Sequence, residues 1–201
     1  MDPSDIGKAY DQITHLWQRP GFDRSNGIAQ HQRALAFASK AGFALDIGCG
    51  CTGRFISLLG QHGFSAEGLD VSSQMLRLAK ARHPEVPFYH ADICTFAFEK
   101  RYAFISAWDS IWHLPLASQE PVLRKIVAGL EKGGVFIFSF GGTDAPGEMQ
   151  NRHMGPEVYY STLGTNGFVS LMLALGCQIK HLEFDQYPEP HAYLVVQKES
   201  D

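Results

Sequence analysis

Apolar residues recur along the chain with two periods, one typical of β-strands and the other of α-helices. Short apolar runs predict parallel strands over residues 44–47, 65–69, 87–93, 102–107 and 135–140. Helical spacing of apolar residues follows Gly53, Ser72 and Ser118, so strands and helices alternate as they do in a parallel α/β sheet. Two more strands, 178–187 and 192–198, flank a proline-containing connection and predict an antiparallel pair.

The ends of two predicted helices depend on proline and glycine. Ser118 precedes Pro121 at the expected start of one helix, and Gly133 with Gly134 is expected to stop it. A later helix is closed by Gly176, and its apolar face consists of Phe168, Leu171, Met172 and Leu175.

The first 40 residues predict a helical cap. A helix over residues 4–17, ended by Pro20 and Gly21, carries one apolar stripe that consists of Ile6, Tyr10, Ile13 and Trp17. A second helix is predicted over residues 25–40. An aromatic stripe at helical spacing is usually packed on the core, so core packing is one interpretation of Tyr10 and Trp17.

Residues 142–165 are rich in Gly and Pro and lack a clear period. A connection of this length is long for a compact domain and usually indicates function or mobility. We therefore expect a segment that forms, with the N-terminal helix, the wall of a substrate site and becomes ordered when ligands bind, and the alternative is a loop packed permanently on the sheet.

Length and charge limit the possible classes of protein. A chain of 201 residues, 45% of them hydrophobic, suits one complete domain over residues 1–201 and is too short for two large ones. The net charge of −4 provides no broad positive surface for phosphates, which argues against a nucleic-acid partner. No apolar run approaches the length that spans a membrane, so no membrane partner is expected.

The four cysteines, Cys49, Cys51, Cys94 and Cys177, do not form the framework of a disulfide-rich protein, and no signal segment begins the sequence. We therefore expect a cytoplasmic protein. Cys49 and Cys51 could suggest a metal site, but no second pair of Cys or His residues lies at ligand spacing. Buried or loop thiols are the better interpretation, and no metal is expected.

Residues 44–53, Ala-Leu-Asp-Ile-Gly-Cys-Gly-Cys-Thr-Gly, predict a buried strand that runs into a glycine turn. The helix expected from Arg54 would direct its free N–H groups and positive dipole end at an anion, as in nucleotide sites. The spacing Gly48-x-Gly50-x-x-Gly53 also matches the dinucleotide fingerprint, so an NAD-binding oxidoreductase is one interpretation.

Two acids favour another interpretation. Asp46 lies two residues before Gly48, and Asp70 ends the next predicted strand. With them the stretch resembles motif I of the class I S-adenosylmethionine (SAM) dependent methyltransferases, hydrophobic-Asp-hydrophobic-Gly-x-Gly-x-Gly, although that family's third glycine falls at Thr52. A reversed final strand extends the resemblance over residues 44–198. The resemblance implies an α/β fold, a three-layer Rossmann-like sandwich whose seven-stranded sheet is mostly parallel with an antiparallel last strand.

The resemblance also implies SAM as the cofactor and gives individual residues roles. Asp70 is expected to bind the ribose hydroxyls, a role that its place about 20 residues beyond the turn also favours. Asp92 is expected to accept the adenine amino group, with a plain turn residue as the alternative. The expected cofactor contacts are Asp46, Gly48, Cys49, Gly50, Asp70, Val71, Met75, Asp92, Ile93, Trp108, Tyr10 and Trp17.

The end of the fourth strand is the expected place for reacting groups, because ligands of open α/β sheets bind at the carboxyl ends of strands. Asp109 and His113 follow that strand, and either could remove a proton from a hydroxyl or ammonium acceptor. Asp109 could instead order the amino-acid end of the cofactor, and His113 could be a packed or capping residue. Arg152, His153, Tyr159 and Tyr160 are the expected contacts for the methyl acceptor.

The sequence thus predicts a methyltransferase that moves a methyl group from SAM to O, N or S of a small molecule. The alternatives are an NAD-binding oxidoreductase and a non-catalytic SAM-binding domain. Asp46, the final strand pair and the chain length argue against the oxidoreductase, whereas the sequence does not separate an enzyme from a binding domain.

Overall fold

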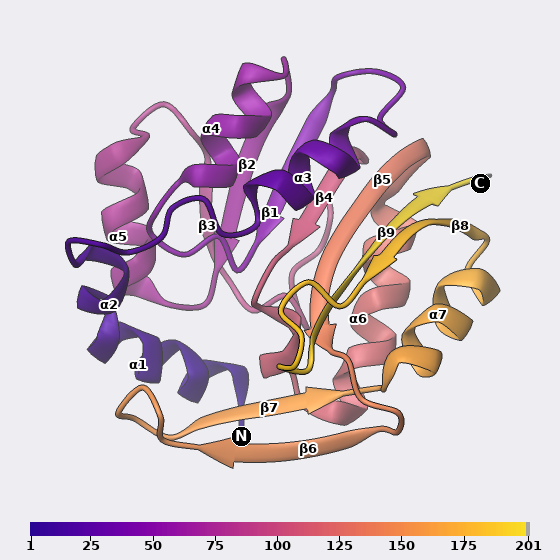
Figure 1. Cartoon of the computed structure of the whole chain (residues 1–201). Helices are drawn as coiled ribbons and strands as arrows, with labels where there is room; N and C mark the ends of the chain where they lie inside the picture. The colour runs from indigo at the N-terminus through magenta and orange to yellow at the C-terminus, as the bar shows by residue number, and fades with distance from the viewer. Residues whose placement is uncertain (200–201) are drawn as a thin grey trace.

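The computed structural model describes residues 1–199, and these form a seven-stranded sheet between two layers of helices (Figure 1). The strands of this sheet are β1 (Phe43–Ile47), β2 (Ser65–Asp70), β3 (Phe88–His90), β4 (Tyr102–Ala107), β5 (Leu130–Gly141), β8 (Cys177–Glu183) and β9 (His191–Lys198). Their order is β3-β2-β1-β4-β5-β9-β8, and only the pairs that include β9 are antiparallel. The predicted fold class is confirmed.

Helices cover both faces of the sheet. One face carries α3 (Ile28–Leu35), α4 (Arg54–Gln61) and α5 (Ser73–Arg82), and the other carries α6 (Leu116–Gly129) and α7 (Thr165–Ala174). On β5, Phe136, Phe138 and Phe140 pack with α6 and α7, while Val135 and Ile137 pack with α3 and α4. Burial on both faces explains why this strand is a continuous apolar run.

The carboxyl ends of the parallel strands are covered by two segments from opposite parts of the sequence (Figure 1). One consists of α1 (Pro3–Ile13) and α2 (His15–Gln18), and the other is a hairpin of β6 (Gly147–Asn151) and β7 (Val158–Thr162). Ile6 and Ala9 of α1 pack on Val158 and Tyr159 of β7 in a separate apolar cluster. A short 3₁₀ helix, η1 (Ile111–His113), lies close to this cluster, after β4.

The structure corrects several predicted helix boundaries. The helix predicted over 4–17 is broken at Thr14, and the one predicted over 25–40 is shorter because it starts after Gly27, whose φ is +81°. The helix expected to begin near Ser118 starts at Leu116, whose N–H group donates to the hydroxyl of Tyr159. Pro121 therefore lies inside α6.

The expected stop at Gly133 and Gly134 is also wrong. The helix α6 ends at Gly129, where a Cβ atom would lie 2.4 Å from the ring of Phe98, and β5 begins with the next residue. The two later glycines lie within β5, where its register with β4 shifts. Side-chain packing between distant elements, rather than the local glycine signal, sets this boundary.

Residues 142–165 are the largest local correction, because the segment predicted to lack periodic structure contains β6 and β7. Met149 pairs with Tyr160 and Gln150 with Tyr159 in an antiparallel ladder. The pairing depends on support from α1 and from a hydrogen bond of Tyr159 to Glu148, at 2.6 Å. Ordering of this segment upon ligand binding stays a prediction.

None of the helices in residues 1–199 combines the length and the apolar character that crossing a bilayer requires. Within the same residues, no group of three or more His, Cys, Asp or Glu side chains could hold a metal ion.

Candidate functional site

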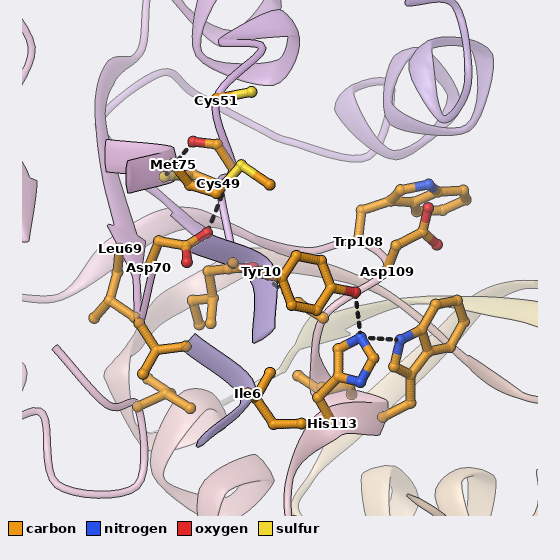
Figure 2. A pocket seen from close by; sticks show the side chains of 18 of the residues that line it. Ile6, Tyr10, Cys49, Cys51, Leu69, Asp70, Met75, Trp108, Asp109 and His113 are labelled. Carbon is orange, nitrogen blue, oxygen red and sulfur yellow. Dashed lines mark hydrogen bonds between the residues drawn. The ribbon is translucent and has the colours of Figure 1, made fainter. Parts of the chain in front are cut away.

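A cavity of about 300 Å³ lies where β1, β2 and β4 end, and α1 and the hairpin contribute to its walls (Figure 2). Open α/β sheets bind ligands at this edge. The volume is at the lower end of the roughly 300–1,000 Å³ that is usual for small-molecule sites. Every residue that the sequence assigns to cofactor contact, except Asp46, lines this cavity.

The glycine turn after β1 forms the floor of the cavity. Gly48, Gly50 and Gly53 have φ angles of +70°, +57° and +67°, a region that residues with a side chain rarely adopt. A Cβ atom on Gly48 would lie 2.2 Å from Cβ of Ser110, so glycine is also required there by close approach. The Gly48 and Cys49 N–H groups both donate to the carbonyl of Leu69, which ties the turn to β2.

Asp70 at the end of β2 is held in place by backbone donors. Its Oδ2 accepts from the Gly50 N–H at 2.8 Å, and its Oδ1 accepts from the Ser72 N–H, also at 2.8 Å. Burial raises the pKa of this carboxyl, and the hydrogen bonds partly oppose that rise. Each carboxylate oxygen has further acceptor capacity, and the side chain lines the cavity (Figure 2).

The wall beside Asp70 is largely apolar. Val71, Met75 and Ile93 line it, together with Asp92. The Oδ1 atom of Asp92 accepts from the Cys94 N–H at 2.8 Å, which is the turn arrangement that the sequence leaves open as the alternative. The same carboxylate also lines the cavity, so the turn role and a ligand role are compatible.

Asp46 lies behind the glycine turn and does not line the cavity. Its side chain is buried, and burial raises its pKa to about 7, against the opposing effects of Arg54 and of a hydrogen bond with Ser106. Direct contact with the methionine end of the cofactor therefore stays a prediction. The charge of Arg54, whose guanidinium donates to Thr52 Oγ1 in the turn at 3.0 Å, favours the ionised form of Asp46.

Tyr10, His113 and Trp112 form a hydrogen-bonded cluster opposite the glycine turn (Figure 2). His113 Nδ1 lies 2.8 Å from the carbonyl oxygen of Tyr159, so this nitrogen carries the proton. Nε2 is then an acceptor for Tyr10 Oη at 2.7 Å and for Trp112 Nε1 at 3.0 Å. Burial lowers the pKa of His113 to about 4, so the ring is neutral near pH 7.

Asp109 also lines the cavity, and its backbone has an unusual conformation, with a φ of +52°. The Asp109 N–H donates to Ser139 Oγ at 2.7 Å, and the Ser139 hydroxyl donates to Asp109 Oδ1 at 3.1 Å. The side-chain amide nitrogen of Asn26 lies 3.4 Å from Asp109 Oδ2. The backbone carbonyl of Asn26 accepts a hydrogen bond from Arg54 Nε at 3.0 Å. A carboxylate and a guanidinium therefore lie on either side of Asn26 at one end of the cavity.

The helix α1 is fastened to the rim of the cavity. Asp11 Oδ1 accepts from the Ser72 hydroxyl at 2.6 Å and from the Gln74 N–H at 2.9 Å, at the start of α5. These hydrogen bonds lower the pKa of Asp11 despite the opposing effect of burial. Gly7 allows the close approach, because a Cβ atom there would lie 2.5 Å from the carbonyl oxygen of Val71.

The hairpin brings only one of the four expected acceptor contacts to the cavity. Tyr160 lines it, as does Met154. Tyr159 does not, because its side chain packs toward α6 and Glu148. Arg152 and His153 are exposed and lie outside the lining, and Arg152 pairs with Glu157 at 3.3 Å.

Sequence reasoning missed Arg54, Asn26, Asp11 and His191. A signal existed for Arg54, because a cation in the first turn of a helix opposes the helix dipole and suggests a specific role. Asn26 and Asp11 carried no pattern that distinguishes them from surface residues. The partners of His191 become visible only after folding.

Comparison with known proteins agrees with this geometry. Residues 44–134 match the family model of a methyltransferase domain. A dTDP-3-amino-3,6-dideoxy-α-D-glucopyranose N,N-dimethyltransferase from Streptomyces fradiae is 31% identical over 100 residues, which cover 49% of this chain and 39% of the relative.

Solved structures match over nearly the whole chain. Magnesium protoporphyrin IX methyltransferase from Synechocystis PCC 6803, with bound SAM, gives a TM-score of 0.74 at 16% identity, covering 99% of this chain and 98% of that one. The [4+2]-cyclase SpnF gives a TM-score of 0.77 at 14% identity, and the match covers 100% of this chain and 98% of the cyclase. The family match over residues 44–134 and the shared fold agree with the resemblance of the sequence to the class I, Rossmann-like SAM-dependent methyltransferases.

The chain spans only 39, 41 and 48% of the length of curated relatives that are 31, 35 and 32% identical to it. The activity and the acceptor of this protein are therefore argued from its own site.

Proposed function

We propose that this protein is a SAM-dependent methyltransferase that methylates the nitrogen of a small amine. The observation that carries the proposal is the arrangement of the cavity. Asp70 and the glycine turn form one wall, and the hydrogen-bonded pair of Tyr10 and His113 forms the opposite wall. A site with these two walls can hold a nucleoside on one side and an acceptor group on the other.

The residues present fit SAM. The free acceptor capacity of Asp70 suits a ribose diol, and Val71, Met75 and Ile93 offer an apolar surface for a purine. Gly50 leaves open space where a side chain would otherwise project. At the other end, Arg54 and Asp109 on either side of Asn26 suit the carboxylate and ammonium of an amino acid.

Bound SAM supplies a methyl group on a positively charged sulfur. The protein's part in such a displacement is to align the acceptor and exclude water. The Tyr10 hydroxyl donates a hydrogen bond to neutral His113, so its oxygen lone pairs can accept a hydrogen bond from an N–H group of an acceptor. Trp17 of α2 lines the same cavity, together with Ile6 of α1, and helps to keep water from it.

An amine fits this wall better than an alcohol or an acid. A hydroxyl acceptor must lose its proton, and His113, with a pKa of about 4 and two donors on Nε2, is a weak base. A neutral amine attacks without prior loss of a proton. Arg152 and His153 lie outside the lining, so the hairpin supplies no cation to bind an acidic acceptor.

The volume and the relatives support a small acceptor. A cavity of about 300 Å³ leaves little space beyond the cofactor. The relative from Streptomyces fradiae is named for N,N-dimethylation of an amino sugar nucleotide. That name supports nitrogen as the methylated atom here, with an amino sugar as one acceptor to test.

Calorimetry followed by transfer of a labelled methyl group tests the proposal. We expect SAM and its demethylated product, S-adenosylhomocysteine, to bind and NAD not to bind. With matched pairs of amines and alcohols of the same skeleton, including dTDP-3-amino-3,6-dideoxyglucose, we expect label on the amine.

Binding of NAD without SAM would overturn the cofactor assignment. Methylation of the alcohols alone would overturn the amine assignment. Binding of SAM without transfer to any acceptor would contradict the proposed activity and favour a binding domain or, as the fold match to the cyclase illustrates, a different reaction.

A further inference from the structure

His191, the first residue of β9, lies between two carboxylates that come from different parts of the fold. Its Nε2 atom is 3.0 Å from Oδ1 of Asp109, and its Nδ1 atom is 2.5 Å from Oδ1 of Asp185. The other oxygen of Asp185 accepts from the side chain of Gln30 in α3 at 2.7 Å. The His191 and Asp185 side chains are only 9% and 5% exposed.

The two contacts determine the protonation of His191. A neutral imidazole has one donor nitrogen and one acceptor nitrogen, whereas an imidazolium has two donors. Both ring nitrogens of His191 face carboxylate oxygens, so both must donate. The uncharged indoles of Trp108 and Trp112 also lie against the ring. Burial lowers the pKa of His191, but the two carboxylates outweigh it and raise the pKa above its ordinary value.

One negative charge remains after His191 is paired. The group of Asp109, His191 and Asp185 carries two carboxylates and one imidazolium, and Asp185, whose oxygens contact His191 and Gln30, does not line the cavity. Oδ1 of Asp109 is also occupied, by His191 and Ser139. Within residues 1–199, Oδ2 has a long contact of 3.4 Å with Asn26, and Asp109 lines the cavity. The unbalanced charge is therefore available to a ligand at Oδ2.

We propose that His191 is a positioning residue that holds Asp109 as the ionised anchor for an ammonium group of a bound ligand. The inference rests on the proposed function, because the cavity must bind a ligand with such a group. The ammonium can belong to the amino-acid end of the cofactor or to a charged group of the acceptor other than the neutral amine that is methylated. Three contacts fix Asp109 in its left-handed conformation, one to His191 and two to Ser139, so the anchor is preorganised.

Two ligands that differ in the amino-acid end test the anchor and its source. S-adenosylhomocysteine carries the ammonium, and 5′-methylthioadenosine lacks the whole amino-acid end. In calorimetry on Asp109→Asn and His191→Gln, we expect the affinity for S-adenosylhomocysteine to fall about 10- to 100-fold, with methylthioadenosine affinity unchanged. His181→Gln is the matched control, because His181 lies on the neighbouring strand and outside the cavity lining.

The second arm measures the acceptor. If both variants bind S-adenosylhomocysteine normally but show a raised KM for the amine found by methyl transfer, the acceptor is the source of the ammonium. If both variants bind both ligands normally and their KM for the amine is unchanged, the proposal that Asp109 anchors an ammonium group is wrong. Absence of S-adenosylhomocysteine binding in the wild-type protein would instead contradict the proposed function, so the two failures are distinguishable.

A spectroscopic measurement tests the role of His191 independently of any ligand. Long-range ¹H–¹⁵N spectra, assigned with His191→Gln, should show both ring nitrogens protonated at pH 7. Asp185→Asn should lower the pKa of the ring, because it removes one of the two charges that hold the proton. A neutral tautomer at pH 7 in the wild-type protein would overturn the inference, even if the variants bind ligands weakly for structural reasons.

Discussion

At the scale of single residues, Asp70 joins the glycine turn to the cavity. We predict that Asp70→Ala weakens SAM binding about 10- to 150-fold, because hydrogen bonds to a charged acceptor contribute roughly 1.5–3 kcal/mol. Calorimetry on the folded variant checks this, with Asp144→Ala as the control for removal of an exposed carboxylate. Unchanged affinity would remove Asp70 from the ribose site.

At the scale of single elements, the helix α1 is attached to the start of α5 through Asp11. Because Asp11 accepts hydrogen bonds at the start of α5, it acts as a cap supplied by another helix. Replacing a capping residue by alanine costs about 0.5–2 kcal/mol, so we predict that Asp11→Ala speeds hydrogen exchange in residues 3–13 about 2- to 30-fold.

The matched control on the same helix is Asp5→Ala, which removes a carboxylate that pairs with exposed Lys8 at 3.1 Å. Exposed pairs contribute little, so exchange in this variant should stay close to that of the wild type. Equal acceleration in both variants would mean that Asp11 does not fasten α1 to the rim.

On the scale of the whole molecule, two buried histidines couple folding to pH. Burial lowers the pKa of His31 to about 3 and that of His113 to about 4, whereas an unfolded chain has ordinary histidines near 6.5. The unfolded state therefore binds protons that the folded state excludes. As pH falls from about 6.5 toward 4, each histidine lowers the free energy of unfolding by up to about 1.4 kcal/mol per pH unit.

Groups with raised pKa values act in the opposite direction. Protonation of Asp46 and His191 favours the folded state as pH falls. The contribution of His31 is therefore measured as the difference in pH dependence between the wild type and a variant. The measurement is urea unfolding between pH 6.5 and 4.5. As pH falls, the free energy of unfolding of His31→Phe should decrease less steeply than that of the wild type, by about 1.4 kcal/mol per pH unit. His153→Phe, at an exposed site, should follow the wild type, and parallel slopes in all three proteins would contradict the prediction.

Most of the sheet could be predicted from the sequence because its signals are local. The strand 102–107 was located to the residue, and the reversed last strand was expected from apolar runs separated by prolines. The predictions for the helix α6 and for the hairpin were less accurate. A hydroxyl from Tyr159 caps one end of α6, and packing with α1 supports β7, so both depend on residues distant in sequence.

The sequence by itself determined the fold class, the glycine turn and the strand-end acids, since glycine backbone freedom and apolar period act over a few residues. Only the tertiary structure decided which side chains share the cavity. It brought Tyr10 to His113, turned Arg152 and His153 away, and placed His191 between Asp109 and Asp185. The physical reason is that hydrogen bonds and burial depend on distance in space, which the spacing of residues along the chain does not give.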